Sequence, residues 1–174
     1  MILVTGGAGY IASHTCLALA AASEPYLVLD NFSNSRPGVL ERMARITGAA
    51  PLYVQGDVRD AALLEQVFAE HPVTAVVHFA GLKAVGESVR EPLRYYDNNV
   101  AGTLALVRAM QAANVRTLVF SSSATVYGDP ASSPIREDFP LFATNPYGWS
   151  KLMVEQMLAD TDTAEPGQWR IARL

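Results

Sequence analysis

The stretch ILVTGGAGYIAS, residues 2–13, joins an apolar run to a cluster of glycines and then to a segment of helical character. Glycines at such a junction permit a tight turn and let the backbone approach a pyrophosphate, while the following helix N-terminus presents unpaired N–H groups. A run of glycines is by itself weak evidence for a dinucleotide site. This run lies between a predicted strand and a predicted helix, which is the context that such a site requires. The stretch therefore predicts a strand–turn–helix unit that binds a dinucleotide, with a ligand-free tight turn as the alternative.

Two glycine patterns overlap in this turn. Gly7, Gly9 and Ala12 fit G-x-G-x-x-A, whereas Gly6, Gly9 and Ala12 fit the wider-spaced relative of that pattern. Either spacing places small residues where the backbone must come close to a diphosphate. We therefore expect Gly6, Gly7 and Gly9 to be cofactor-binding residues.

Apolar runs recur along the chain, separated by stretches long enough for helices. They cover residues 2–4, 26–29, 52–54, 75–79 and 117–120, and a sixth begins within 169–174. Because these runs are continuous rather than alternating, we expect strands buried on both faces of a parallel sheet that helices cover. The sequence thus predicts the α/β class, a doubly wound parallel sheet of the Rossmann type, cut near its sixth strand.

Two segments between the strands have distinct signatures. After Pro92, the side chains of Tyr96, Val100, Leu104 and Val107 recur at spacings of three and four, which predicts an amphipathic helix whose apolar stripe they form. Residues 129–145 are rich in Pro, Ser and Thr. They are predicted to form a long irregular loop, either a functional lid or a solvated connection.

The composition argues against several classes of protein. The 174 residues include 13 Lys and Arg against 17 Asp and Glu, a net charge of −4, so nucleic-acid binding is not expected. No apolar run approaches the roughly 20 residues of a membrane-spanning helix, and the N-terminus lacks the basic stretch of a secretory signal. A single cysteine, Cys16, favours a reducing compartment, so we expect a soluble, cytoplasmic protein. His14, His71 and His78 lack metal-ligand spacing, so no metal site is predicted.

Two aspartates close the second and third apolar runs. Asp30 lies about 20 residues after the glycine turn, where a carboxylate accepts hydrogen bonds from the adenosine ribose and repels the extra phosphate of NADP. NAD is therefore the expected cofactor, although Arg36 lies nearby and a surface turn is the alternative for Asp30. Asp57 is placed either to meet the adenine edge or to form a turn or helix cap.

A tyrosine and a lysine stand one helical turn apart in NPYGWSK, residues 145–151. Asn145 is a good N-cap and Pro146 suits the first helical position, so Tyr147 and Lys151 share one face. A free tyrosine has a pKa of about 10, so stabilising a phenolate near neutrality requires roughly 4 kcal/mol. An ammonium about 5 Å away supplies roughly 3 kcal/mol at an effective dielectric of 20, and a nicotinamide cation a comparable amount. The pair is common on helices, however, and without context it indicates only packing and solvated charge.

Three serines follow the fifth apolar run, in FSSSATVYGD, residues 120–129. The ligand crevice of an open α/β sheet lies outside the carboxyl ends of its strands, so Ser121, Ser122 and Ser123 are predicted to border it. A serine there can donate a hydrogen bond to a reacting hydroxyl or carbonyl group; a strand-end turn is the alternative.

The chain resembles the N-terminal half of the UDP-glucose 4-epimerases, within the extended short-chain dehydrogenase/reductase family. The resemblance covers essentially the whole chain, and two of its motifs, FAGLKAVGES and YYDNNV, are more specific than the glycine turn. The matching segments are TGGAGYIAS (5–13), LDNFSNS (29–35), HFAGLKAVGES (78–88), YYDNNVAGT (95–103), FSSSATVYGD (120–129) and PYGWSKLMVEQ (146–156).

This resemblance implies a mechanism. NAD takes a hydride from C4 of a UDP-hexose while Tyr147 removes the 4-hydroxyl proton, and Ser123 hydrogen-bonds that oxygen. Lys151 holds the nicotinamide ribose and favours the phenolate. The 4-keto sugar rotates and takes the hydride back on its other face, which interconverts UDP-glucose and UDP-galactose in galactose metabolism.

The resemblance also implies an NAD site and part of a substrate site. Lys83, Ser123 and Tyr147 are the expected substrate-binding residues. The expected cofactor-binding residues beyond the glycines are Tyr10, Ile11, Asp30, Asn31, Asn34, Ser35, Asp57, Val58, Phe79, Ala80, Gly81, Lys83, Asn98, Ser121, Tyr147 and Lys151.

The sequence departs from the family at three places. Ala12 stands where the family has a third glycine, and Trp149 replaces a lysine on the helix side away from Tyr147. The loop between Ser123 and Tyr147 is one residue short, which leaves Ser122 as the alternative catalytic serine.

The resemblance divides the family's protein into two parts. We expect residues 1–174 to be the NAD-binding Rossmann-like domain and the C-terminal substrate domain to be largely absent, so that this chain alone turns over little substrate. A homodimer is expected through the helices that carry Val100 and Met153. The alternatives are a non-catalytic NAD-binding fragment and a related sugar-nucleotide dehydratase, although dehydratases carry an acidic residue beside the catalytic serine.

Overall fold

A computed structural model describes residues 1–174 and contains one six-stranded parallel sheet. The strand order is β3-β2-β1-β4-β5-β6, and every neighbouring pair is parallel. This confirms the predicted doubly wound α/β fold, including the sixth strand. The strands are β1 (Ile2–Thr5), β2 (Tyr26–Asp30), β3 (Leu52–Gln55), β4 (Ala75–His78), β5 (Thr117–Phe120) and β6 (Arg170–Arg173).

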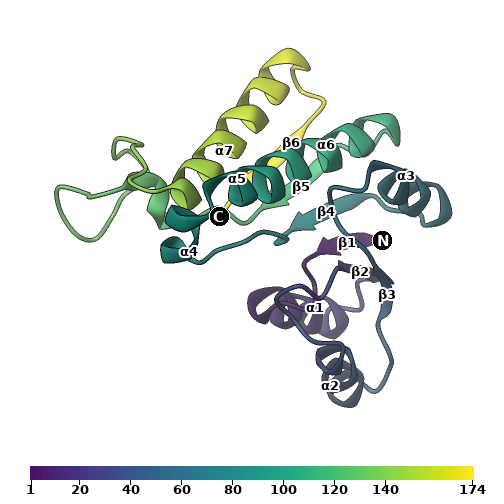
Figure 1. Ribbon diagram of the computed structural model, residues 1–174. Coiled ribbons are helices and arrows are strands. Elements are labelled where there is room, and N and C mark those ends of the chain that lie inside the picture. The colour runs from purple at the N-terminus through teal and green to yellow at the C-terminus, as the bar shows by residue number, and fades with distance from the viewer.

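Helices cover both faces of the sheet (Figure 1). On one face, α1 (Tyr10–Ala21) and α2 (Gly38–Thr47) pack on β1 and β2 around buried Val4, Val28 and Cys16. On the other face, a larger core includes Leu3, Leu118 and side chains of α3 (Ala61–Glu70), α6 (Gly102–Ala112) and α7 (Pro146–Ala164). Alternate residues of β1 and β2 therefore enter opposite cores.

The prediction that all strands are buried on both faces is wrong for the two edges. Leu3, Val4, Val28 and Val76 in the inner strands are fully buried. In β3, however, Leu52 and Tyr53 are both 55% exposed, and three of the four residues of β6 are exposed. An edge strand lacks a neighbour on one side, so apolar residues alone cannot ensure its burial.

The helical region after Pro92 is interrupted by a wider turn. It consists of α5 (Pro92–Tyr95), a π-helix η1 (Tyr96–Ala101) and α6, preceded by the short α4 (Val85–Arg90). The predicted stripe is confirmed only in part: Val107 is buried in the core and Val100 packs against it. Tyr96 and Leu104 are only half-buried, whereas Tyr95, Asn99 and Thr103 are buried. Because a π-turn contains an extra residue, a pattern counted at 3.6 residues per turn slips by one.

The N-termini of α3 and α7 show which residues cap these helices. Asp60, not Asp57, is the N-cap of α3, and its side chain accepts a hydrogen bond from the backbone N–H of Leu63. Asn145 caps α7 as predicted, accepting from Gly148 N at 2.9 Å, with Pro146 in the first turn. These caps set where each helix starts relative to the preceding strand end.

The segment 129–145 has neither helix nor strand, as predicted. It follows a short 3₁₀ helix, η2 (Ala124–Tyr127), and returns to it where Phe142 N donates to Val126 O at 2.9 Å. None of the helices combines the length and the apolar character needed to cross a membrane.

Candidate active site

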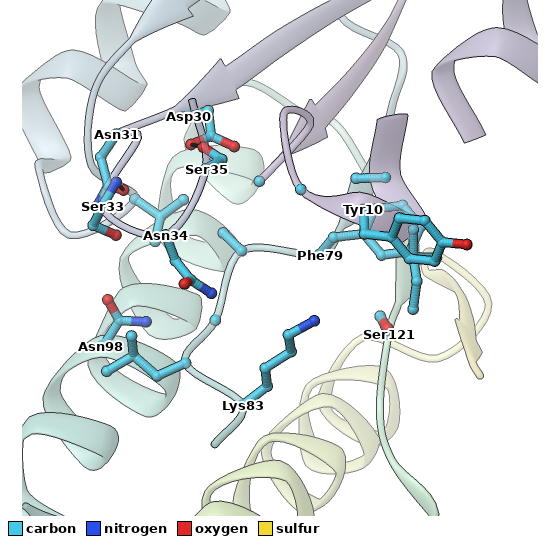
Figure 2. A pocket seen from close by; sticks show the side chains of 18 of the residues that line it. Tyr10, Asp30, Asn31, Ser33, Asn34, Ser35, Phe79, Lys83, Asn98 and Ser121 are labelled. Atoms are coloured by element: carbon cyan, nitrogen blue, oxygen red, sulfur yellow. Dashed lines mark hydrogen bonds between the residues drawn. The ribbon is translucent and has the colours of Figure 1, made fainter. Parts of the chain in front are cut away.

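A cavity of about 590 Å³ lies at the carboxyl ends of the strands. Its walls come from the turn after β1, the loops after β2 and β4, the serines after β5 and the start of α7. Figure 2 shows the segment from Asp30 to Ser35 at one end, Tyr10 and Ser121 at the other, and the Lys83 ammonium pointing between them. The sheet therefore brings together segments that are far apart in the sequence.

Most of the predicted site residues border this cavity. Gly7 and Asp57 are the two exceptions. Those that line it are Gly6, Gly9, Tyr10, Ile11, Asp30, Asn31, Asn34, Ser35, Val58, Phe79, Ala80, Gly81, Lys83, Asn98, Ser121, Ser123, Tyr147 and Lys151. Lining residues not predicted as site residues include Leu29, Ser33, Gly56 and Leu82; their residue types carry no signal of a binding site.

The glycine turn has the close backbone contacts that its sequence indicates. Gly6 has φ +68°, and a Cβ there would lie 2.7 Å from Ala80 N. Gly9 N donates to Gly6 O at 2.9 Å, and a Cβ on Gly9 would lie 3.0 Å from that same oxygen. The methyl group of Ala12 is accommodated, since this residue is 1% exposed within the α1 core.

Gly7 has a different role from the predicted one. It does not line the cavity; a Cβ at Gly7 would instead lie 2.8 Å from a methyl of Val28 and 3.0 Å from Val4 O. Its small size therefore permits close packing of the turn on β1 and β2. Of the two overlapping patterns, the one that starts at Gly6 describes the cavity.

Asp30 is buried and held in a fixed orientation. Its Oδ2 accepts from Ala8 N at 3.0 Å, and its Oδ1 accepts from Phe32 N and from Ser35 Oγ, both at 2.8 Å. The carboxylate is 8% exposed and borders the cavity. Arg36 is exposed and does not line the cavity.

Asp57 faces other protein groups rather than the cavity. Its carboxylate accepts from Asn31 Nδ2 at 2.9 Å and from Arg59 Nη2 at 2.7 Å. The Arg59 hydrogen bonds, together with the backbone and Asn31 bonds, hold the pKa of Asp57 far below its usual value. Arg59 also bonds Asp97 at 2.6 Å, so this network ties the β3 end to η1.

Lys151 is buried against β5. Its Nζ donates to Ser121 O at 2.8 Å and lies 4.7 Å from the centre of the Phe120 ring. Burial lowers the pKa of Lys151 to about 8, a shift that the nearby carboxylate of Glu155 opposes. The side chain therefore remains mostly a cation at neutral pH.

Tyr147 lies one turn before Lys151 and is 9% exposed. Its ring packs edge-on against Tyr95 with centroids 6.4 Å apart, and the residue borders the cavity. Trp149 does not line the cavity, and its ring packs edge-on against the Phe142 ring with centroids 5.7 Å apart. The position at which the family has a lysine therefore lies away from the site.

The serines after β5 differ in their hydrogen bonds. Ser122 Oγ donates a hydrogen bond to the Glu155 carboxylate. The Ser122 hydroxyl proton is therefore already engaged. Ser123 Oγ accepts from Thr125 N at 3.2 Å and from Thr125 Oγ1 at 2.9 Å. The Ser123 hydroxyl proton is thus available to a ligand, which favours Ser123 over Ser122 as the donor to a reacting oxygen.

Asn99 is a structural residue that the sequence did not reveal. Its Oδ1 accepts from Leu82 N at 2.8 Å, and its Nδ2 donates to Leu82 O and to Ser150 Oγ, both at 2.9 Å. Ser150 Oγ in turn donates to Tyr147 O. The loop after β4 and the first turn of α7 are therefore held together by one buried amide from η1.

The cavity has the features that a dinucleotide requires. The turn at Gly6 has no room for a side chain, a helix N-terminus opens on to the cavity, and the buried Asp30 carboxylate borders the cavity beside this turn. Residues 2–174 match the NAD dependent epimerase/dehydratase family. The chain belongs to this family.

Individual members of the epimerase/dehydratase family show how far the similarity extends. The chain is 56% identical to the UDP-glucose 4-epimerases of Yersinia pestis and of Bacillus subtilis. Each alignment covers 99% of this chain and 51% of the relative. The chain thus spans about half the length of these relatives.

Solved structures of the family share the fold described above. A UDP-glucose 4-epimerase from Bifidobacterium longum, in complex with NAD+ and UDP, superimposes with a TM-score of 0.96 at 52% identity. The enzyme from Stenotrophomonas maltophila, with bound NAD and formylated UDP-arabinopyranose, superimposes with a TM-score of 0.95 at 48% identity. Both matches cover 99% of this chain and 51% of the other chain.

Proposed function

We propose that the chain is the NAD-binding part of a UDP-hexose 4-epimerase that interconverts UDP-glucose and UDP-galactose. The observation that carries this proposal is the meeting of Tyr147, Lys151 and Ser123 with the Gly6 turn around one cavity. Its relatives at 56% identity are UDP-glucose 4-epimerases. In this proposal residues 1–174 are the cofactor domain, and most contacts to uridine and sugar lie in a region that they do not include.

The cofactor site is built for NAD. The proposed contacts are the Gly6–Gly9 turn for the pyrophosphate and Asp30 for the adenosine ribose, with Lys151 near the nicotinamide ribose. Asp30 is already oriented by Ala8 N and Ser35 Oγ, so its charge is fixed before the cofactor arrives. When bound, NAD supplies the reversible oxidation of the C4 alcohol.

The protein's own groups control the proton at O4 of the sugar. Tyr147 is the proposed group that takes this proton and returns it, and Ser123 donates a hydrogen bond to the same oxygen. The Lys151 cation stabilises the phenolate through space, because a buried pair interacts in a low-dielectric environment. Lys83 extends into the cavity, where its ammonium is suited to the diphosphate of the substrate.

The helices α6 and α7 support the proposal of a homodimer. They present a shallow depression lined by Gln111, Met153, Met157 and Thr161, and Met153 is 45% exposed. A mixed surface of methionine and polar side chains is suited to self-association. Sedimentation of wild type and Met153→Glu tests it: a wild-type dimer that the charge dissociates is expected, and a monomeric wild type would contradict it.

The proposed setting is galactose metabolism in the cytoplasm. The one cysteine, Cys16, is buried, and burial raises the pKa of its thiol to about 12. A single cysteine leaves residues 1–174 without an internal disulfide, which supports the proposal of a reducing compartment. Detection of the native protein only in an oxidising compartment would contradict this.

Titration with NAD and UDP-galactose tests the proposed function. Calorimetry of the purified chain with NAD is expected to show one binding site. Addition of UDP-galactose is then expected to produce weak reduced-cofactor absorbance and little UDP-glucose, because most of the proposed contacts to the sugar lie outside residues 1–174, with Tyr147→Phe as the matched control that lacks the absorbance. Absorbance that persists without UDP-glucose indicates oxidation alone. NAD binding without either signal indicates a non-catalytic fragment, and absence of NAD binding contradicts the whole proposal.

A further inference from the structure

His78 is completely buried at the end of β4, and the proposed chemistry leaves it without a role. Its two ring nitrogens contact two threonines: Nδ1 lies 2.6 Å from Thr5 Oγ1, and Nε2 lies 2.8 Å from Thr103 Oγ1. Thr5 is the last residue of β1, directly before the Gly6 turn, and Thr103 is in α6. The imidazole therefore bridges the sheet and the helix layer immediately behind the cavity.

The direction of these hydrogen bonds follows from one neighbouring group. Thr103 Oγ1 lies 2.6 Å from Asn99 O, which is a carbonyl oxygen and can only accept. The Thr103 hydroxyl therefore donates its proton to Asn99 O. In its contact with His78 it must accept a hydrogen bond from Nε2–H. In the neutral imidazole the other nitrogen, Nδ1, is then an acceptor.

The hydrogen bonds on the other side of the ring run in the same direction. Thr5 Oγ1 accepts from Ala80 N at 3.4 Å and donates its proton to His78 Nδ1. The result is a one-way series of donors, from Ala80 N–H through Thr5, His78 and Thr103 to Asn99 O. We call this series the His78 relay.

Both ends of the His78 relay reach residues that shape the cavity. Ala80 lines the cavity and packs against Gly6, where an added Cβ would lie 2.7 Å from Ala80 N. Asn99 holds Leu82, another lining residue, through two hydrogen bonds. Reversing any donor in the relay would leave two protons or two lone pairs facing one another in a buried site, which is costly.

The charge of the imidazole is constrained as well. The His78 ring stacks on the Phe120 ring with centroids 5.8 Å apart, and Lys151 Nζ lies 4.7 Å from the centre of the Phe120 ring. Burial, together with the Lys151 charge, lowers the pKa of His78 to about 3. A protonated His78 would also supply a second donor to Thr5, whose own proton would then lack an acceptor.

We infer that His78 is a positioning residue for the cofactor: as a permanently neutral Nε2–H imidazole, it fixes the loop from Phe79 to Leu82 through the His78 relay. It touches neither the substrate nor the cofactor and acts through Ala80 and Asn99. The effect of His78 on cofactor binding rests on the proposed NAD site. The assignment of the His78 tautomer does not depend on that site.

Two-bond ¹⁵N–¹H correlation spectra of the ¹⁵N-labelled wild-type chain test the tautomer without any cofactor. We expect His78 to show a protonated Nε2 and an unprotonated Nδ1 that stay unchanged from about pH 5.5 to about pH 8.5. A His78→Gln variant assigns the signals, and the exposed His14 gives a reference pattern in the same spectrum. A protonated Nδ1, or signals that change across this range, would overturn the inference.

Calorimetry with NAD tests the positioning role. Thr103→Val removes the hydroxyl at similar shape, and we expect the Kd for NAD to rise about tenfold, while Thr103→Ser stays within about twofold of wild type. The matched control is Thr163→Val, which removes a hydroxyl that donates to Ala159 O, also four residues back, on the surface of α7. Should Thr103→Val not fold, Thr5→Val probes the other end of the relay.

The outcomes separate this inference from the proposed function. Wild-type affinity for NAD in Thr103→Val or Thr5→Val would overturn the positioning role. Absence of NAD binding by the wild-type chain would overturn the proposed function and the positioning role together. In that case the spectra would still decide the tautomer.

Discussion

The ammonium of Lys151 donates a hydrogen bond to the carbonyl oxygen of Ser121, 2.8 Å away. This contact ties α7 to the end of β5 and orients the lysine side chain. Because the side chain is buried, its pKa falls from 10.5 to about 8. The protein therefore carries a buried cation at neutral pH, at a cost to its stability.

Replacement of Lys151 by Met is expected to change how stability depends on pH. Between about pH 8 and about pH 10.5 the unfolded chain binds more protons at this lysine than the folded chain does. The free energy of unfolding therefore contains a contribution that rises with pH across this window, by up to about 3 kcal/mol. Urea unfolding of wild type and Lys151→Met at about pH 7.5 and about pH 10 measures the difference between the two curves.

The variant is expected to be the more stable protein at about pH 7.5, with the gap closing as pH rises. Lys83→Met, at the exposed lysine of the cavity, shows what loss of a lysine charge does by itself. A gap that is the same at both pH values would contradict the prediction.

Tyr147→Phe is expected to abolish reduction of bound NAD by UDP-galactose and to leave NAD affinity within about twofold of wild type. The change removes only the hydroxyl, and the ring keeps its edge-on contact with Tyr95. Loss of a positioned acid–base group typically costs about 10²- to 10⁴-fold in rate. Stopped-flow absorbance measures the rate, and calorimetry the affinity.

A comparison of serine variants accompanies this test. Ser123→Ala is expected to slow the reaction more than Ser122→Ala, because the Ser122 proton is already donated to Glu155. A larger effect at Ser122 would reverse the assignment of the catalytic serine.

The sequence predicted the parts of the molecule that depend on local pattern. The Gly6 turn, the Asn145 cap and the apolar inner strands follow from residue type and spacing, and the structure has them in place. The fold follows from the same signals, because continuous apolar strands alternating with helices leave few other arrangements.

The parts that the sequence missed depend on contacts across the fold. Asp57 was expected at the adenine edge or in a turn or helix cap; the turn is present, since Arg59 N donates to its Oδ1, and Arg59 and Asn31 take up the carboxylate. The position of β3 at an edge of the sheet, and the π-turn that buries Asn99, are likewise set by tertiary packing. A linear pattern carries no signal for either, since the same residues would suit a central strand or a regular helix.

Gly6→Ala is expected to eliminate measurable NAD binding and to destabilise the protein. The substitution combines a left-handed φ of +68° with a Cβ that would lie 2.7 Å from the backbone nitrogen of Ala80. Strain at a positive φ costs about 1 kcal/mol, and the contact with backbone cannot relax without moving the loop after β4. Thermal unfolding and calorimetry with NAD measure the two effects.

Variants of two other glycines distinguish the effect of a positive φ from the effect of a crowded Cβ. Gly48 has φ +77° with open space around it, and Gly38 has open space without a positive φ. We expect Gly48→Ala to lose about 1 kcal/mol of stability with unchanged NAD affinity, and Gly38→Ala to change neither. NAD binding by Gly6→Ala at wild-type affinity would show that the turn is not the pyrophosphate site.

Asp30→Asn is expected to reduce the preference for NAD over NADP by about tenfold or more. The carboxylate borders the cavity and is held by Ala8 N and Phe32 N. In the proposed NAD site its negative charge faces a phosphate on the adenosine ribose. Two like charges about 5 Å apart repel by roughly 3 kcal/mol at an effective dielectric of 20, and the neutral amide removes this repulsion. Titration of each variant with NAD and with NADP gives the ratio of the two affinities.

The amide has only one acceptor oxygen, so its NH₂ group faces either the Ala8 N–H or the Phe32 N–H and the Ser35 hydroxyl, and the variant loses some stability. Asp60→Asn is the matched control, because Asp60 also accepts from a backbone N–H, at Leu63, but lies outside the cavity. An equal change in the affinity ratio for both variants would assign the effect to stability. An unchanged ratio in Asp30→Asn would show that the Asp30 charge does not select the cofactor, because the repulsion is the only contribution that distinguishes the two dinucleotides at this residue.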